Sequence, residues 1–123
     1  MKKLCVLLLL TVSLFASAKE YTFSPGDVQA MKQLLGSGNL QPGDAVVLKD
    51  GTYHNLEEIH FTGKGVSGKP IVWRAENPGK AVISGKLRLK IYGEYLQLED
   101  LLFYKAWAIG YDMIYFQGEK GVY

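Results

Sequence analysis

Histidines and paired carboxylates are the side chains of this sequence that could take part in acid–base or metal chemistry. His54 and His60 lie six residues apart, without HExxH or another spacing used by metal ligands. Glu57-Glu58 and Glu99-Asp100 are adjacent pairs, and neighbours on a strand point to opposite faces. Neither pair is therefore expected to converge on one atom. We interpret the histidines as hydrogen-bonded or solvated groups and the carboxylates as surface charges.

The glycine-rich segment "GKGVSGKP", residues 63–70, does not have the pattern of a phosphate-binding loop. Lys69 is followed by Pro70, where such a loop carries Ser or Thr. We interpret the segment as a turn. Trp73 and the tyrosines are expected to pack in the core or at corners rather than to serve as platforms for sugars. The residues themselves predict no catalytic group and no metal ligand.

A basic face is the one surface feature with a candidate binding role. Lys86, Arg88 and Lys90 alternate with aliphatic residues in the segment 86–91, so the three cations share one face of a strand. Such a face could attract an anionic polymer and is the candidate substrate-contacting site. The alternative is an ordinary strand surface whose charges only keep the protein soluble.

The first 18 residues predict a secretory signal peptide. Two lysines precede a 12-residue apolar run, residues 4–15, and small residues lead to a cleavage site after Ala18. The run is shorter than the about 20 residues that span a bilayer. Cleavage leaves 123 − 18 = 105 residues, enough for one small domain. Cys5 lies in the leader, so the mature chain would carry no thiol. We expect a secreted or periplasmic bacterial protein.

The charge of the mature chain is balanced. Loss of Lys2 and Lys3 reduces Lys plus Arg from 14 to 12, which equals the 12 Asp plus Glu. A neutral chain gives no reason to expect nucleic acid as a partner, or a membrane once the signal is removed.

Residues 24–35 predict a helix that ends at Gly36. Ser24 can cap it together with Asp27 three residues later, and Pro25 suits the first turn. Gly36 follows the last apolar residue, as in many helix ends. One face carries apolar residues at helical spacing, namely Val28, Met31, Leu34 and Leu35.

The rest of the chain predicts β-structure. Short apolar runs are separated by Gly, Pro, Asn and Asp, which is typical of strands joined by turns. These runs cover residues 45–48, 59–61, 71–75, 81–83, 87–91 and 95–103.

A repeat of 25 residues favours a solenoid over a hairpin. Val46, Ile71 and Leu96 are separated by 25 and 25. The same step relates Leu48, Trp73 and Leu98. A second strand of each coil would begin near Ile59 and Val82, a looser step of 23. A fixed period in this range is typical of stacked coils, and a meandering β-sandwich is the alternative.

The Asp50-Gly51 pair then becomes a corner of a coil rather than the tip of a hairpin. A glycine supplies unusual backbone angles at no steric cost. A two-residue hairpin would need a strand directly after the turn, and "TYHNLEE" pairs poorly with "AVVL".

Three stretches of the sequence together resemble a known family: "GDAVVLKDGTY", "FTGKGVSGKPIVWRAENPGKAVISGK" and "LRLKIYGEYLQLEDLLF". They are similar to the N-terminal coils of polysaccharide lyase family six, which contains alginate lyases and chondroitinase B. The resemblance covers residues 25–103. It implies an all-β, right-handed parallel β-helix with an N-terminal capping α-helix. We divide the chain into a signal peptide (1–18), a cap with a helix (19–38) and the first few coils of an incomplete β-helix (39–123).

The resemblance also implies an activity. Family members cleave uronate-containing polysaccharides by β-elimination, often with calcium on the uronate carboxylate, a Lys as base and an Arg beside it. Those groups lie on later coils, and this chain stops at Tyr123. We therefore expect a truncated N-terminal part with no catalytic residue, no metal ligand and no cofactor of its own, although calcium is expected for the full-length family.

The sequence thus predicts part of a secreted lyase that is inactive alone. Alginate is the first expected substrate and dermatan sulfate the second. The alternatives are a non-catalytic β-solenoid module that binds acidic glycans and a non-functional gene remnant. An uncovered last coil exposes unpaired strand groups, so self-association is expected.

Overall fold

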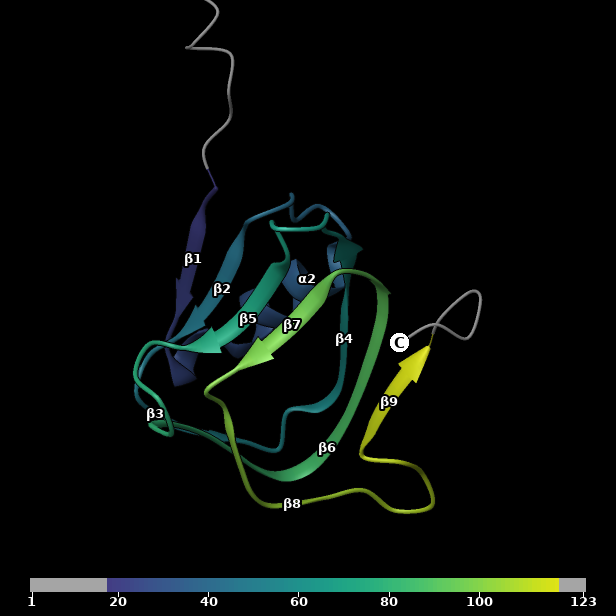
Figure 1. Ribbon diagram of the computed structural model, residues 1–123. Coiled ribbons are helices and arrows are strands. Elements are labelled where there is room, and N and C mark those ends of the chain that lie inside the picture. Colours follow the sequence, from purple (N-terminus) through teal and green to yellow (C-terminus); the bar gives the residue numbers. More distant parts are fainter. Residues whose placement is uncertain (1–17, 118–123) are drawn as a thin grey trace, which may run out of the picture.

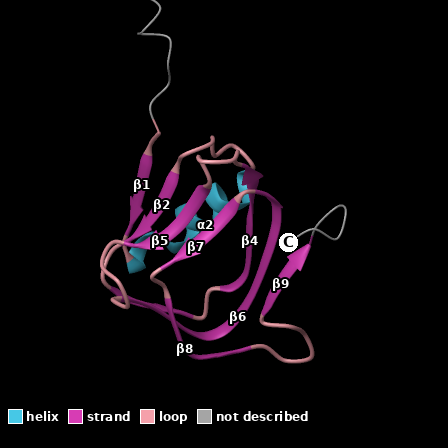
Figure 2. Ribbon diagram, viewed as in Figure 1, coloured by secondary structure: helices cyan, strands magenta, loops and turns pink. Residues whose placement is uncertain are grey.

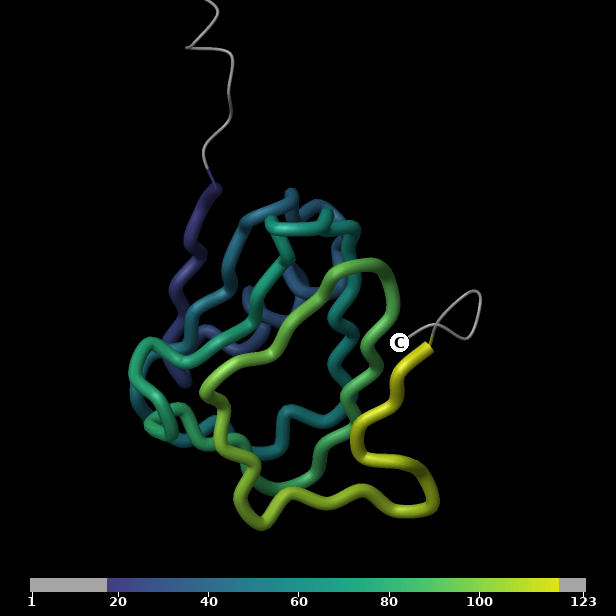
Figure 3. Tube along the Cα trace, viewed as in Figure 1, coloured from purple at the N-terminus to yellow at the C-terminus, as the bar shows by residue number. Residues whose placement is uncertain are grey.

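The computed structural model describes residues 18–117, which form three stacked coils of parallel strands (Figures 1 and 3). Residues 1–17 of the predicted signal peptide, with Cys5, lie outside the described residues, as do residues 118–123. The first coil contains β2 (Ala45–Leu48), β3 (Gly51–His54) and β4 (Glu57–Lys64). The second contains β5 (Ile71–Ala75) and β6 (Ala81–Glu94). The third contains β7 (Leu96–Glu99), β8 (Leu102–Trp107) and β9 (Ile114–Gln117).

Each coil contributes to three parallel sheets. The first sheet has the order β1-β2-β5-β7, where β1 (Glu20–Phe23) adds a strand beside the first coil. In the second sheet β6 pairs with β3 and β8, and in the third sheet β6 pairs with β4 and β9. Because the strands that pair are parallel, each must be reached by a crossover rather than by a hairpin. The predicted right-handed parallel β-helix is confirmed, and the β-sandwich alternative is wrong.

The corner after β2 is formed as the sequence predicted. Asp50-Gly51 turns the chain from β2 into β3, which lies in a different sheet and is labelled in Figure 1. Figure 2 distinguishes the strands from the connecting loops in the same view. Gly51 has a φ of 146°, which L-residues rarely adopt. The amide of Asn77 in the next coil donates a 3.0 Å hydrogen bond to the Asp50 carboxylate. The same corner is thereby linked to the coil stacked on it.

Strand β6 is bent so that it belongs to two sheets. The sequence showed separate apolar runs at 81–83 and 87–91, whereas the structure has one strand of 14 residues. Gly85 bends it with a φ of 79°, and the register with β8 shifts at this point. The Lys86 amide donates a 2.9 Å hydrogen bond to Asn55 Oδ1, which occupies the space that a side chain at residue 85 would need.

A short helix covers the interior at the first-coil end. A 3-10 turn, η1 (Pro25–Asp27), leads into α2 (Val28–Ser37), which lies behind β2 and β5 in Figure 1. The Asp27 carboxylate accepts hydrogen bonds from the Ser24 amide and hydroxyl at 3.1 and 2.8 Å. These bonds lower the pKa of Asp27 below its ordinary value.

The predicted apolar face of the helix is confirmed, but its predicted end is not. Met31 and Leu35 are buried in the core, while Val28 and Leu34 pack against it. The helix ends at Gly38, whose φ of 74° is left-handed, and not at Gly36. The apolar pattern stops at Leu35 because the last helical turn faces solvent, so the pattern marks the end of the buried face only.

Inward-facing side chains of the coils form one continuous core. Trp73 and Phe61 meet edge to face with ring centroids 6.0 Å apart, and both are fully buried. The Tyr53 hydroxyl donates to the Lys49 carbonyl oxygen at 2.8 Å, and burial raises the pKa of Tyr53 to about 12. The expectation that Trp73 packs in the core is therefore confirmed.

The register corrects two of the predicted steps. Trp73 pairs with Leu98, a step of 25, but Val46 pairs with Trp73, a step of 27. A difference of two residues keeps the same side chains inward, so the apolar pattern could not distinguish 25 from 27. The step of 23 from Ile59 to Val82 is wrong. Ile59 pairs with Leu89, 30 residues later, because Val82 belongs to another sheet.

Candidate functional site

The predicted basic residues share the outward face of β6. Lys86, Arg88 and Lys90 alternate along the strand with side chains that are buried. Those buried side chains are Leu87, Leu89 and Ile91. The alternation read from the sequence is therefore confirmed, but the three cations have different surroundings.

Lys90 belongs to a network that joins the first and second coils. Its Nζ lies 3.1 Å from Glu58 Oε1 on β4. The same oxygen lies 2.8 Å from Nε2 of His60, whose Nδ1 lies 3.0 Å from the Tyr92 hydroxyl. With the proton on Nε2, neutral His60 donates to Glu58 and accepts from Tyr92. The hydrogen bonds from His60 and Lys90 lower the pKa of the Glu58 carboxyl.

The histidines are hydrogen-bonded, as expected. His54 Nδ1 lies 2.9 Å from the Ser84 hydroxyl, so this pair also connects the first coil to the second. His60 takes part in the network around Glu58. The two rings belong to different sheets and make no common site.

Arg88 has no charged partner among the residues that the structure describes. Its guanidinium carbon lies 4.3 Å from the centroid of the Tyr111 ring, a cation–π contact. Its Nε is shielded from solvent and has no hydrogen-bond acceptor within residues 18–117. This donor therefore lacks the hydrogen bond that buried polar groups usually make.

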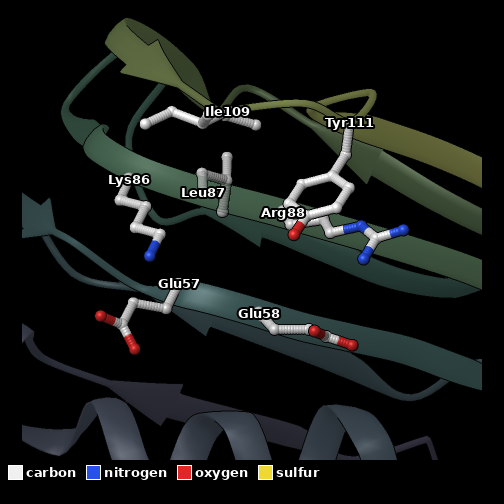
Figure 4. Close-up of a pocket in the computed structure, with 8 residues that line it drawn as sticks. Glu57, Glu58, Lys86, Leu87, Arg88, Ile109 and Tyr111 are labelled. Atoms are coloured by element: carbon white, nitrogen blue, oxygen red, sulfur yellow. The ribbon is translucent and has the colours of Figure 1, made fainter.

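An open hollow of about 250 Å³ lies beside Arg88, between three successive levels of the stack. In Figure 4, Glu57 and Glu58 come from one strand, Lys86 and Arg88 from the next, and Tyr111 from the segment beyond. Leu87, Ala108 and Ile109 complete the lining.

Glu57 and Glu58 are both exposed surface carboxylates, and both line the hollow although they are neighbours on β4. Glu57 has a φ of 60°, which interrupts the strand alternation, and both side chains are exposed at the hollow (Figure 4). Glu58 is paired with His60 and Lys90, whereas Glu57 shares the lining with Lys86, which has no ion pair within residues 18–117. Glu99 and Asp100, the other adjacent pair, are not part of this hollow.

The charges around the hollow nearly cancel. Three cations (Lys86, Arg88 and Lys90) face two carboxylates (Glu57 and Glu58), which leaves a formal charge of +1. The surface is therefore no extended basic ridge that would hold a polyanion by its field alone. Any preference for an anion must come from the local geometry at Arg88.

Sequence reasoning missed Tyr111 and Ile109 as parts of this surface. The tyrosines were expected in the core or at corners, but the Tyr111 side chain is 61% exposed. The signal that could have found it is the coil step. Leu89 pairs with Ile114, so the segment before Ile114 must lie beside Arg88.

The described residues offer no metal site. No group of three or more His, Cys, Asp or Glu side chains within residues 18–117 is arranged to hold an ion. The carboxylates at the hollow are surrounded by lysine and arginine, which compete with a cation for their oxygens. The lining of this hollow therefore does not fit calcium, which the family resemblance implied for the full-length protein and not for this chain. The same part of the chain contains no helix long and apolar enough to cross a membrane.

The capped stack of parallel coils defines a β-helix protein, and comparisons with known proteins identify its family. Residues 28–121 match the model of the chondroitinase B family, and the chain belongs to this family, within polysaccharide lyase family 6. No curated protein matches the chain.

Three solved structures of family 6 enzymes resemble the chain. A mannuronic acid specific lyase from the human gut microbiota is 94% identical, with a TM-score of 0.80, over 85% of this chain and 24% of its own. The alginate lyase AlyGC is 27% identical, with a TM-score of 0.63, over 77% and 12%. The lyase Pedsa3628 from Pseudopedobacter saltans is 27% identical, with a TM-score of 0.60, over 70% and 19%. The chain thus spans about a quarter or less of these relatives.

Proposed function

We propose that these coils are the N-terminal part of an exported lyase that cleaves alginate at its mannuronate blocks by β-elimination. The observation that carries the proposal is the 94% identity to a mannuronic acid specific lyase of family 6. AlyGC, an alginate lyase, supports the same polymer at lower identity. Dermatan sulfate is the second candidate substrate, because the matching family model is described as chondroitinase B.

β-Elimination requires a positioned base and a group that stabilises negative charge. The reaction removes a proton next to the uronate carboxylate, so the negative charge that develops there must be stabilised and a positioned base must take the proton. The described residues contain no carboxylate cluster for a metal. We therefore propose that the coils described here act as scaffold and as a binding surface, and that this chain alone is inactive.

Exchange of coils with the mannuronate-specific relative tests this proposal. Residues 19–117 of this chain would replace the matching segment of that relative, and residues 19–123 would be assayed alone. Both would be given polymannuronate, polyguluronate and dermatan sulfate, with and without calcium. The ultraviolet absorbance of the unsaturated product is the measurement. We expect the exchanged protein to cleave polymannuronate and residues 19–123 to release nothing.

Two outcomes would contradict the proposal. A folded but inactive exchanged protein would mean that these coils cannot support the lyase. Product formed by residues 19–123 alone would mean that catalytic groups lie within this chain. The relative with its own coils serves as the positive control.

A non-catalytic module for acidic glycans is a second candidate. It is favoured by Arg88, which lies at an open hollow and has no carboxylate partner in the described part of the chain. Measurable affinity of the full chain for mannuronate oligomers, without product, would support this role. Export is also a proposal. We expect the N-terminus of the protein recovered outside the cytoplasm to be Lys19.

A further inference from the structure

We propose that the hollow beside Arg88 is a subsite for one unsulfated uronate residue, with the carboxylate on Arg88 and the sugar ring against Tyr111 and Ile109. The inference rests on the proposed function for the class of polymer. It places a contact with that polymer on the first three coils. The residues that make this contact are not required for the lyase reaction itself.

The guanidinium of Arg88 is the group that selects a carboxylate. It makes no ion pair and no hydrogen bond within residues 18–117, and its Nε is shielded from water. A planar guanidinium matches the two oxygens of a carboxylate through two parallel hydrogen bonds. Because Nε is shielded, a carboxylate in the hollow would accept its two hydrogen bonds from the terminal nitrogens, Nη1 and Nη2. Neither of these nitrogens has an acceptor among the residues that the structure describes.

Tyr111 holds this guanidinium in place before a ligand arrives. The ring lies 4.3 Å from the guanidinium carbon, which limits the freedom of a side chain that otherwise has many rotamers. The same segment presents Ile109, whose side chain is 71% exposed, on the wall of the hollow (Figure 4). Binding sites commonly combine such an apolar wall with a few convergent polar groups. The apolar face of a pyranose ring fits this wall.

The carboxylates across the hollow disfavour ligands that carry more than one negative charge on each sugar. Glu57 is exposed and can accept hydrogen bonds from sugar hydroxyls. With a formal charge of +1 around the hollow, one carboxylate is neutralised. A sulfate group beside that carboxylate would face Glu57 and Glu58 without a cation left to balance it. The subsite therefore favours plain uronate over sulfated glycan.

Lys90 is excluded from the subsite by its pairing with Glu58. Its Nζ is held 3.1 Å from that carboxylate, which also accepts from His60. The structure thus divides the predicted basic face into a paired cation, Lys90, and two cations that remain available at the hollow, Lys86 and Arg88.

Equilibrium dialysis of the full chain against labelled mannuronate trisaccharide tests the subsite, because dialysis reports binding whatever the state of association. The neutral trisaccharide of β-1,4-linked mannose has the same ring but no carboxylate and serves as the matched ligand. We expect Arg88→Gln and Tyr111→Ala to weaken mannuronate binding by about ten- to hundredfold, the range for a hydrogen bond to a charged group. Arg88→Lys should recover part of the loss, because it keeps the charge without the fork.

Lys80→Gln is the charge-matched control, since Lys80 lies in the turn between β5 and β6 and outside the hollow. It should leave the affinity unchanged. Thermal unfolding of each variant shows that it remains folded. Equal binding of the neutral and acidic trisaccharides, equal binding by all variants, or no binding at all would overturn the subsite. None of these results would contradict the proposed lyase function, which the coil exchange tests. An inactive exchanged protein, in turn, would not contradict the proposed subsite.

Discussion

At the scale of single residues, Glu58 has the most contacts of the charged groups on the outward face of β4. It accepts hydrogen bonds from His60 on its own strand and from Lys90 on β6, and these bonds lower its pKa. A carboxyl whose folded-state pKa is depressed contributes stability above its unfolded pKa. That contribution is lost as the pH falls through the folded-state value.

We predict that Glu58→Gln lowers the free energy of unfolding at pH 7 by less than about 1 kcal/mol, because both side chains of the pair are partly exposed to solvent. The difference from the parent chain should vanish at a pH below the folded-state pKa of Glu58, where the parent carboxyl is itself protonated. Urea unfolding at both pH values measures the two differences.

Glu57→Gln is the matched control for this change. Glu57 is the adjacent exposed carboxylate, and it has no ion pair among the described residues. Its substitution should have no comparable effect at either pH. If Glu58→Gln lowered the free energy of unfolding equally at neutral and acid pH, the ionised Glu58 carboxylate would not be stabilised by its hydrogen bonds to His60 and Lys90.

The sequence predicted which side of β6 carries the cations but not which of them is available. Alternation with aliphatic residues is a local pattern and survives any register. The pairing of Lys90 with Glu58 and the contact of Arg88 with Tyr111 depend on steps between coils. Those steps are set by the lengths of corners, which carry no apolar period.

At the scale of elements, the corner at Gly85 decides whether β6 can serve two sheets. Its φ of 79° is strained for any other residue, and an added Cβ would overlap Asn55 Oδ1, which accepts from the Lys86 amide. Gly79 has a similar φ of 73°, but a Cβ there would meet nothing within 4 Å.

We predict that Gly85→Ala destabilises the chain by more than Gly79→Ala. Both changes carry the cost of a side chain at positive φ, roughly 1–3 kcal/mol. The excess at residue 85 measures the displacement of Asn55 and His54, whose side chains an added Cβ would overlap. Urea unfolding of the two variants gives this difference directly, and equal losses would show that Asn55 moves at no cost.

The helix offers a prediction of the opposite sign. Gly36 lies inside α2, and an added Cβ would make ordinary contacts of 3.6 Å with His60. We expect Gly36→Ala to raise the free energy of unfolding by about 0.5–1 kcal/mol, because alanine loses less backbone freedom in a helix.

Gly38→Ala is the comparison for this change, because Gly38 ends α2 in the left-handed region. It should destabilise the chain, since alanine is disfavoured at a φ of 74°. Thermal unfolding monitored by circular dichroism distinguishes the two. Stabilisation by Gly38→Ala would mean that the helix end differs from the one described.

At the scale of the whole molecule, the two ends of the described stack differ in how they are covered. Helix α2 covers the first-coil end, where Met31 and Leu35 are fully buried. Within the described residues, β7 and β8 each pair with a strand of the second coil only. The third coil also carries large side chains that are exposed, among them Tyr104 and Tyr115. Strands β7 and β8 therefore present an open edge with apolar groups beside it.

We predict that the purified chain associates through this third coil, because open strand edges pair with other edges unless charge or cover prevents it. Replacing Tyr104 and Tyr115 together by lysine should lower the association measured by sedimentation velocity as the protein concentration is raised. Val66→Lys is the control, since Val66 is 47% exposed in the turn before β5 and is not part of β7, β8 or β9. A parent chain that stays monomeric and unfolds cooperatively would contradict the prediction, and so would equal association of the lysine variant and the parent.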